Sequence, residues 1–234
     1  MSATEIQTAS GSVCWNCKAG TGSAHFCPSC KKIQPLPPDA GYFGFFGLPE
    51  KLRLDAVDLE KRFHQLSWKL HPDNFVRASE RERKLSLERS SELNDAFRTL
   101  RDPIRRVEYL LRRADLRKDG QSKQQAPPEL LEEVFELNES LDELRRARQA
   151  GGNGEEMTAL RRQLLVAKKH FEEKLGAVDA ELDAVFAQWD AAVDSGAGSE
   201  ERSKLMVRMN EILNRRAYIR NLVENVQKEL AEAA

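Results

Sequence analysis

Apolar residues recur at three- and four-residue steps along two stretches in the first half of the chain, which is the spacing of one helical face. Asp55 stands before the first stretch as a predicted N-cap, and Pro72 ends that stretch because proline cannot continue a helix. Pro103 follows the second stretch and favours the first turn of another short helix. The pattern predicts an antiparallel helical hairpin with the stripes Leu59, Phe63, Leu66 and Leu70, then Leu85, Leu93, Ala96, Phe97 and Leu100.

Three longer helical patterns follow Pro128, separated by glycine-containing turns at 151–154 and 195–198. Long stripes joined by short turns are typical of an antiparallel three-helix bundle, so we expect a mainly α protein. His170 and Trp189 are interpreted as ordinary bundle residues. The stripes are Leu130, Val134, Leu137, Leu141 and Leu144; Met157, Leu160, Leu164, Phe171, Leu175, Val178, Leu182, Val185 and Trp189; and Leu205, Met209, Ile212, Ile219, Val223, Val226 and Leu230.

All four cysteines fall in the first 30 residues, as two Cys-x-x-Cys knuckles. Paired knuckles can converge as four thiolates around a metal ion, with zinc as the default occupant and iron as the alternative. Disulfides or idle thiols are the competing interpretation, which a reducing compartment and the double spacing disfavour. His25 is expected to be a loop residue and not a ligand. The predicted ligands are Cys14, Cys17, Cys27 and Cys30.

Breaks in these patterns suggest three domains. The proline-rich stretch 31–38 is typical of a stiff linker, and 119–122 interrupts the helical pattern again. The predicted organisation is a small metal-binding extension with its linker at 1–38, the hairpin domain at 39–120 and the three-helix bundle at 121–234. The extension is too short to build its own core, so metal binding would supply its folding energy.

Composition and motifs narrow the classes of function. Charged residues make up 32 % of the chain and the formal net charge is −1, so no global field favours nucleic acid. No apolar run reaches membrane-spanning length, and the first residues show neither the basic, apolar pattern of a signal peptide nor the arginine-rich, amphipathic pattern of a mitochondrial presequence. We expect a bacterial cytoplasmic protein, or a mitochondrial matrix protein in a eukaryote, without a membrane or nucleic-acid partner. Phosphate-cradling and dinucleotide glycine motifs are missing, so we do not expect an enzyme.

The tripeptide His71-Pro72-Asp73 lies between the two helices of the hairpin. Proline makes this tip stiff, and it biases the preceding residue away from helical dihedrals. A stiff polar tip without a serine or cysteine nucleophile suits docking against another protein better than catalysis. Lys61, Arg62 and Lys69 fall away from the apolar stripe of the preceding helix, which makes part of its outer surface basic.

From about Tyr42 to Ala114 the chain resembles a J-domain, on the aromatic segment 42–49, the His71-Pro72-Asp73 loop and the segment 94–103. The stretch 106–111 is more specific: together with Tyr42-Phe43 and the acidic helix after Pro128, it resembles the HscB-type J-proteins of iron–sulfur cluster assembly. That resemblance implies a co-chaperone that stimulates the ATPase of a DnaK/HscA-type chaperone and delivers an IscU-type scaffold. A general J-domain co-chaperone and a zinc-ribbon adaptor unrelated to cluster assembly are the alternatives.

The first helix of the bundle carries two surplus apolar residues, Leu131 and Phe135, one position beyond its core stripe. Acidic residues lie on the same side, which suggests a binding surface; a wider core stripe explains the two residues equally well. The resemblance implies that this face holds the scaffold. The contacts that it implies are Leu131, Phe135, Glu136, Glu139 and Glu143, together with Tyr218 from the last helix.

Overall fold

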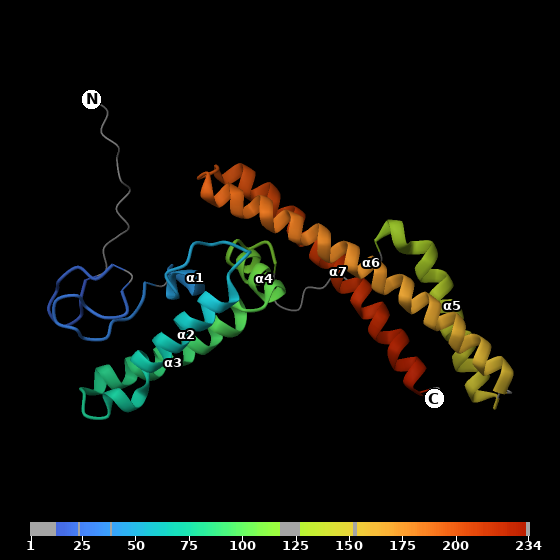
Figure 1. Cartoon of the computed structure of the whole chain (residues 1–234), viewed down its shortest axis with the longest axis horizontal. Coiled ribbons are helices and arrows are strands. Elements are labelled where there is room, and N and C mark those ends of the chain that lie inside the picture. Colours follow the sequence, from blue (N-terminus) through green and yellow to red (C-terminus); the bar gives the residue numbers. More distant parts are fainter. Residues whose placement is uncertain (1–12, 23, 38, 118–126, 152–153, 233–234) are drawn as a thin grey trace. The chain divides into compact units, whose positions relative to one another are not determined.

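The computed structural model describes residues 13–22, 24–37, 39–117, 127–151 and 154–232, and in these ranges every regular element is a helix (Figure 1). The chain divides into two compact units, 1–109 and 110–234, each described here by itself. The mainly α fold that the sequence predicts is confirmed. The predicted domain boundary at residue 120 and part of the turn at 151–154 lie outside the described residues.

The first unit is built on a helical hairpin. Its elements are α1 (Gly41–Phe45), α2 (Ala56–Leu70), the short 3₁₀ helix η1 (Pro72–Phe75), α3 (Glu80–Leu100) and the start of α4 (Pro103–Arg113). Asp55 caps α2 as predicted, because its Oδ1 accepts hydrogen bonds from the N–H groups of Val57 and Asp58. A capping box of Ser79 and Glu82 begins α3.

Side chains from α1, α2 and α3 form one hydrophobic core. The aromatic segment before the hairpin supplies Phe43 and Phe45, each 1 % exposed, and the predicted stripes supply most of the rest. Ile33 also belongs to this core, although it precedes the hairpin and lies in the stretch that resembles a linker. Part of the segment 31–38 is therefore packed into the unit. The buried members are Ile33, Phe43, Phe45, Phe46, Leu59, Leu70, Phe75, Leu85, Leu93, Ala96 and Leu100.

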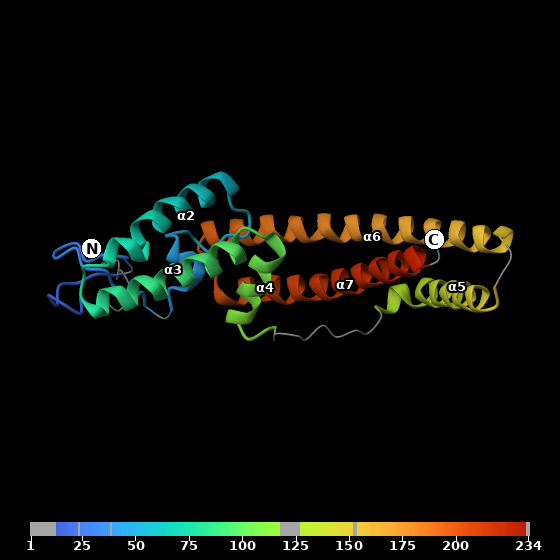
Figure 2. The same cartoon turned by 90° about the horizontal axis from the view of Figure 1, so that it is seen from below.

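The second unit holds η2 (Pro128–Leu130), α5 (Leu131–Gln149), α6 (Gly154–Asp194) and α7 (Ser199–Glu232). Figure 2 shows the short α5 alongside one end of the long α6–α7 pair. Ser140 of α5 accepts a hydrogen bond from Gln163 of α6 at 3.0 Å, and Arg145 of α5 reaches Glu229 of α7 at 2.6 Å. The predicted core stripes are largely buried, including Trp189 at 3 % exposure, which confirms the bundle.

Candidate metal centre and docking surfaces

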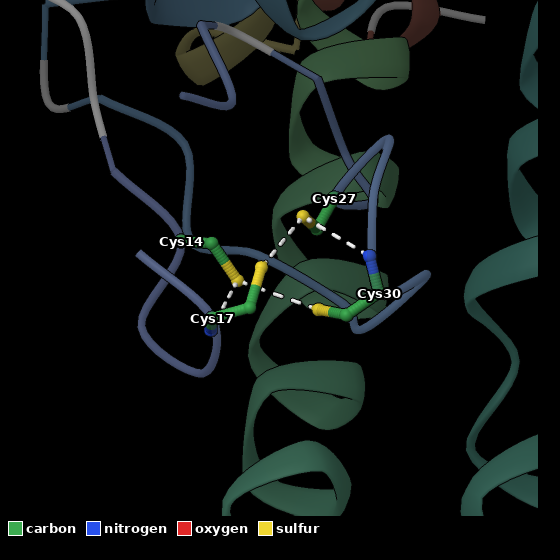
Figure 3. Close-up of side chains that lie close together, drawn as sticks. All are labelled: Cys14, Cys17, Cys27 and Cys30. Atoms are coloured by element: carbon green, nitrogen blue, oxygen red, sulfur yellow. Dashed lines mark hydrogen bonds between the residues drawn. The ribbon is translucent and has the colours of Figure 1, made fainter. Parts of the chain in front are cut away.

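The four cysteine sulfurs converge at one point, as Figure 3 shows, although they come from two separate knuckles. All four Sγ atoms lie within 4.8 Å of one another, and Cys14–Cys30 and Cys17–Cys27 are each 3.6 Å apart. Four thiolates at about 2.3 Å from a tetrahedral zinc ion lie roughly 3.8 Å apart, so the spacing fits such an ion. It is far longer than a disulfide bond of about 2.05 Å. These residues can therefore hold a metal ion.

The surroundings favour the thiolate form at Cys14 and Cys27 but disfavour it at Cys17. The N–H groups of Asn16 and Cys17 donate to Cys14 Sγ at 3.3 and 3.4 Å, and the N–H of Cys30 donates to Cys27 Sγ. Burial raises the pKa of Cys14, but these N–H donors and the neighbouring thiols outweigh it and bring the pKa to about 6. The Ala19 N–H lowers the pKa of Cys17, yet burial and the neighbouring sulfurs raise it to about 11. Because neighbouring sulfurs raise the pKa of Cys17, a bound cation would be needed to keep all four cysteines as thiolates.

The knuckles are fastened to the hairpin through His25. Its Nε2 lies 2.8 Å from the Phe45 carbonyl oxygen, and its Nδ1 lies 3.0 Å from the guanidinium of Arg89. The same guanidinium stacks over the Phe45 ring at 4.2 Å. Burial lowers the pKa of His25 to about 4, with the Arg89 charge adding to the effect, so the ring is neutral at pH 7. As predicted, His25 is not part of the metal cluster.

Two further contacts join the extension to α3. Lys32 forms a 2.8 Å ion pair with Glu82, the residue that completes the capping box. Arg81 stacks on the Trp15 ring at 4.6 Å, and the Trp15 indole N–H donates to the Ile33 carbonyl at 2.7 Å. These contacts hold the extension against the first turn of α3.

The His71-Pro72-Asp73 loop lies exposed at the end of α2, as the sequence predicts. The side chains of His71 and Asp73 are 55 % and 84 % exposed, and His71 Nδ1 accepts a weak 3.3 Å hydrogen bond from the Asp73 N–H. On the side of the loop that faces α3, the hydroxyl groups of Ser86 and Ser90 both donate to the Leu70 carbonyl, at 2.7 and 2.9 Å. These bonds satisfy a main-chain acceptor at the helix end, which would otherwise be unpaired.

The predicted basic residues of α2 differ in their surroundings. Lys61 and Lys69 are exposed, and within the described parts of the chain neither forms an ion pair. Arg62 is half-buried, and its guanidinium donates to Asp58 at 2.7 Å and to the Phe46 carbonyl at 3.1 Å. The two lysines are therefore the accessible cations of this surface, and Arg62 partly serves the packing of α2.

On α5, the two surplus apolar residues are exposed and do not widen the core. Leu131 is 56 % exposed and Phe135 is 69 % exposed, whereas Leu137 is 2 % exposed. The acidic residues around them, Glu136, Glu139 and Glu143, are also exposed. We call Leu131, Phe135, Glu136, Glu139, Glu143 and Tyr218 the α5 face.

Tyr218 lies near the beginning of this face. Arg215, one helical turn earlier on α7, approaches Glu129 at 3.7 Å, just before α5 begins. Tyr218 is half-buried, and burial raises the pKa of its hydroxyl. The structure thus brings the tyrosine to the same end of the bundle as Leu131.

Arg89 is a buried charged residue, 3 % exposed, that the sequence motifs do not identify. Arg89 lies between Leu85 and Leu93 on the side of α3 that faces the core. A charged residue at such a position is unusual, and this is the feature of the sequence that could have identified it. No part of the sequence pattern identifies His25 as its partner, because the two lie 64 residues apart.

None of the described helices is long and apolar enough to cross a membrane. No protein-family model matches the chain. Among curated relatives, the co-chaperone protein HscB homologue of Vibrio vulnificus strain YJ016 is 36 % identical over 153 residues, which cover 65 % of this chain and 85 % of the relative. The mouse iron–sulfur cluster co-chaperone protein HscB is 35 % identical over 132 residues, or 55 % of this chain and 56 % of the mouse protein. The crystal structure of human co-chaperone protein HscB matches with a TM-score of 0.60 at 26 % identity, over 93 % of this chain and 98 % of the human one.

Proposed function

Because the chain belongs to the HscB family of co-chaperones, we propose that it binds an IscU-type iron–sulfur scaffold and delivers it to a DnaK/HscA-type ATPase chaperone. The observation that carries this proposal is the presence of two exposed docking features in one chain. The first unit presents the His71-Pro72-Asp73 tip, and the second presents the α5 face. A protein that only triggered ATP hydrolysis would have no use for the second.

The α2 loop is the proposed chaperone contact. Its tip is stiff, exposed and backed by α3, and Lys61 and Lys69 lie on the helix that leads into it. Arg62 contributes positive charge from its half-buried position. Such a surface attracts an acidic partner, since complementary charge steers association and fixes orientation. Binding would trigger ATP hydrolysis in the chaperone, which then holds the scaffold tightly.

The α5 face is the proposed scaffold contact. Leu131 and Phe135 are apolar anchors that protrude into solvent, and Glu136, Glu139 and Glu143 surround them with negative charge. Interfaces commonly combine a few apolar or aromatic anchors with a polar rim. A basic, partly apolar surface on the scaffold would match this pattern, with Tyr218 at its edge.

We assign zinc to the four cysteines, with iron as the alternative. The convergence of four thiolate donors supports either metal, and the ion would act structurally by cross-linking the two knuckles. Thiolates persist in reducing compartments. The bacterial cytoplasm is therefore the proposed location, or the mitochondrial matrix in a eukaryote. We propose no catalysis by the chain itself, since its relatives are named co-chaperones.

A single-turnover ATPase assay tests the proposal. The DnaK-type chaperone of the same organism is loaded with ATP, and hydrolysis is followed with the co-chaperone alone, the scaffold alone and both together. We expect the two proteins together to stimulate more than the sum of their separate effects. A general folding co-chaperone would stimulate equally without the scaffold, and an unrelated zinc adaptor would not stimulate at all.

A further inference from the structure

Trp68 has the largest exposed fraction, 76 %, among the large apolar side chains in the described parts of the chain. The other tryptophans differ from it: Trp15 donates its indole N–H to the Ile33 carbonyl, and Trp189 is buried. The Trp68 indole N–H has no hydrogen-bond partner among the described residues. A single exposed apolar residue needs no explanation on most surfaces, so its surroundings must decide whether it has a role.

The main chain of Trp68 is held in place while its side chain is free. It lies in the last turn of α2, three residues before His71. Asn74, on the far side of the loop, donates its side-chain N–H to the Trp68 carbonyl at 2.6 Å. This bond ties the helix end to the loop, so the indole projects from a fixed base. Because this main chain is already ordered, covering the indole costs the conformational entropy of its side chain alone.

Charge around Trp68 indicates the kind of partner. Lys69 is its neighbour, and Lys61 lies two helical turns earlier on nearly the same side of α2. Both ammonium groups are exposed and unpaired within the described ranges. Arg62 pairs with Asp58, which leaves that carboxylate neutralised. The exposed carboxylates of Glu60 and Asp73 lie on the same helix and loop. The two unpaired ammonium groups beside the indole suit a partner with an apolar recess and an acidic rim.

We propose that Trp68 is the apolar anchor through which this chain docks on its ATPase chaperone. The inference rests on the proposed function, since the chaperone is the partner assigned to the adjoining loop. The occupant follows from continuity with the proposed chaperone contact: the Trp68 carbonyl is bonded to Asn74, which directly follows the His71-Pro72-Asp73 loop, and Lys61 and Lys69 lie on the same helix. Tryptophan is enriched among the residues that dominate binding energy, and burying its side chain removes about 150–250 Å² from water.

The matched variants are Trp68→Ala and Val57→Ala in the full-length, metal-loaded chain. Val57 is 75 % exposed on the same helix, so it controls for loss of an exposed apolar group away from the loop. The measurement is the co-chaperone concentration that gives half-maximal stimulation of the ATPase of the DnaK-type chaperone. We expect Trp68→Ala to raise that concentration about thirtyfold, a loss of about 2 kcal/mol at 1.4 kcal/mol per factor of ten. Val57→Ala should leave it within twofold, and Trp68→Phe should recover part of the loss.

Other outcomes distinguish failure of the Trp68 anchor from failure of the proposed function. If His71→Gln abolishes stimulation while Trp68→Ala keeps the half-maximal concentration within threefold of the parent protein, the anchor is refuted and the proposed function stands. If His71→Gln stimulates normally, the proposed function fails first. Sedimentation of the free protein tests whether it self-associates. If the protein forms a dimer that Trp68→Ala abolishes, while stimulation of the ATPase is unchanged, the indole binds a second copy of the chain and the inference is overturned. Equal melting temperatures of Trp68→Ala and the parent protein would show that folding is not the cause.

Discussion

The guanidinium of Arg89 lies 3.0 Å from Nδ1 of His25, although the two residues are 64 positions apart. One belongs to the middle of α3, and the other lies two residues before a predicted metal ligand. Arg89 is buried, and a buried cation is costly unless it is well partnered. Its contacts with His25, Glu92 and the Phe45 ring make the extension part of the environment that α3 requires.

Removing the metal should therefore weaken the hairpin as well as the knuckles. We expect about one zinc ion per purified chain, since structural sites of four thiolates are closed. Cys14→Ser or Cys30→Ser should release it and lower the melting temperature of the first unit, because His25 and Ile33 lose their support. Elemental analysis and calorimetry provide the two measurements. Metal loss with unchanged hairpin melting would show that the extension folds independently of α3.

His71→Gln should abolish ATPase stimulation and leave scaffold binding and helical content unchanged. The side chain is exposed, and among the described residues it contacts only Asp73 of the same loop, so its replacement disturbs no core. The measurements are single-turnover hydrolysis, scaffold titration and circular dichroism. Asn74→Ala is a useful companion, because it removes the bond to the Trp68 carbonyl and keeps the tripeptide. Full stimulation by His71→Gln would refute the J-domain role.

The double change Leu131→Ala with Phe135→Ala should reduce scaffold affinity at least thirtyfold with little change in melting temperature. Both side chains are exposed, and anchors of this kind carry about 2 kcal/mol or more each. Leu137→Ala on the same helix is the matched control: it should cost about 2–5 kcal/mol of stability, because Leu137 is buried. Calorimetric titration and melting curves separate the two effects. Normal scaffold binding by the intact double variant would exclude the α5 face.

Acid should weaken the junction between the extension and α3 through Glu82. Burial raises the pKa of this carboxyl, but Lys32 and Ser79 outweigh it and hold the pKa below its ordinary 4.5. A carboxyl with a lowered folded-state pKa stabilises the fold above the unfolded value and loses that contribution as pH falls through the folded value. Stability should thus fall below about pH 4.5.

The matched variant for this effect is Glu82→Gln. It should be less stable than the parent protein at pH 7, and the difference should shrink on acidification, because the glutamine has no charge to lose. Urea unfolding from pH 7 to pH 3 measures this, and loss of metal in acid affects both proteins alike. A constant difference across the range would exclude Glu82 as the titrating group.

Local signals account for what could be predicted. The Asp55 cap, the helix start at Pro103 and the convergence of the cysteines depend on residues close in sequence, whose spacing carries the geometry. Long-range packing was not predictable in this way. Prolines around Leu36 suggested a spacer, yet Ile33 fills the hairpin core, because the hairpin leaves an apolar site that only the folded arrangement reveals. The sequence does not decide whether Phe135 is exposed, for a related reason. A helical residue one position beyond an apolar stripe can face either the core or the solvent.

The burial of Ile33 has a practical consequence for any shortened version of this chain. A protein that began at Asp39 would keep every helix of the hairpin, and sequence alignment alone would recommend it as the minimal J-domain. It would also uncover an apolar site in the hairpin core and leave Arg89 and Glu82 without His25 and Lys32. Weak activity from such a truncated protein would report damaged folding, so point substitutions in the full chain are the sound way to separate the roles of its parts.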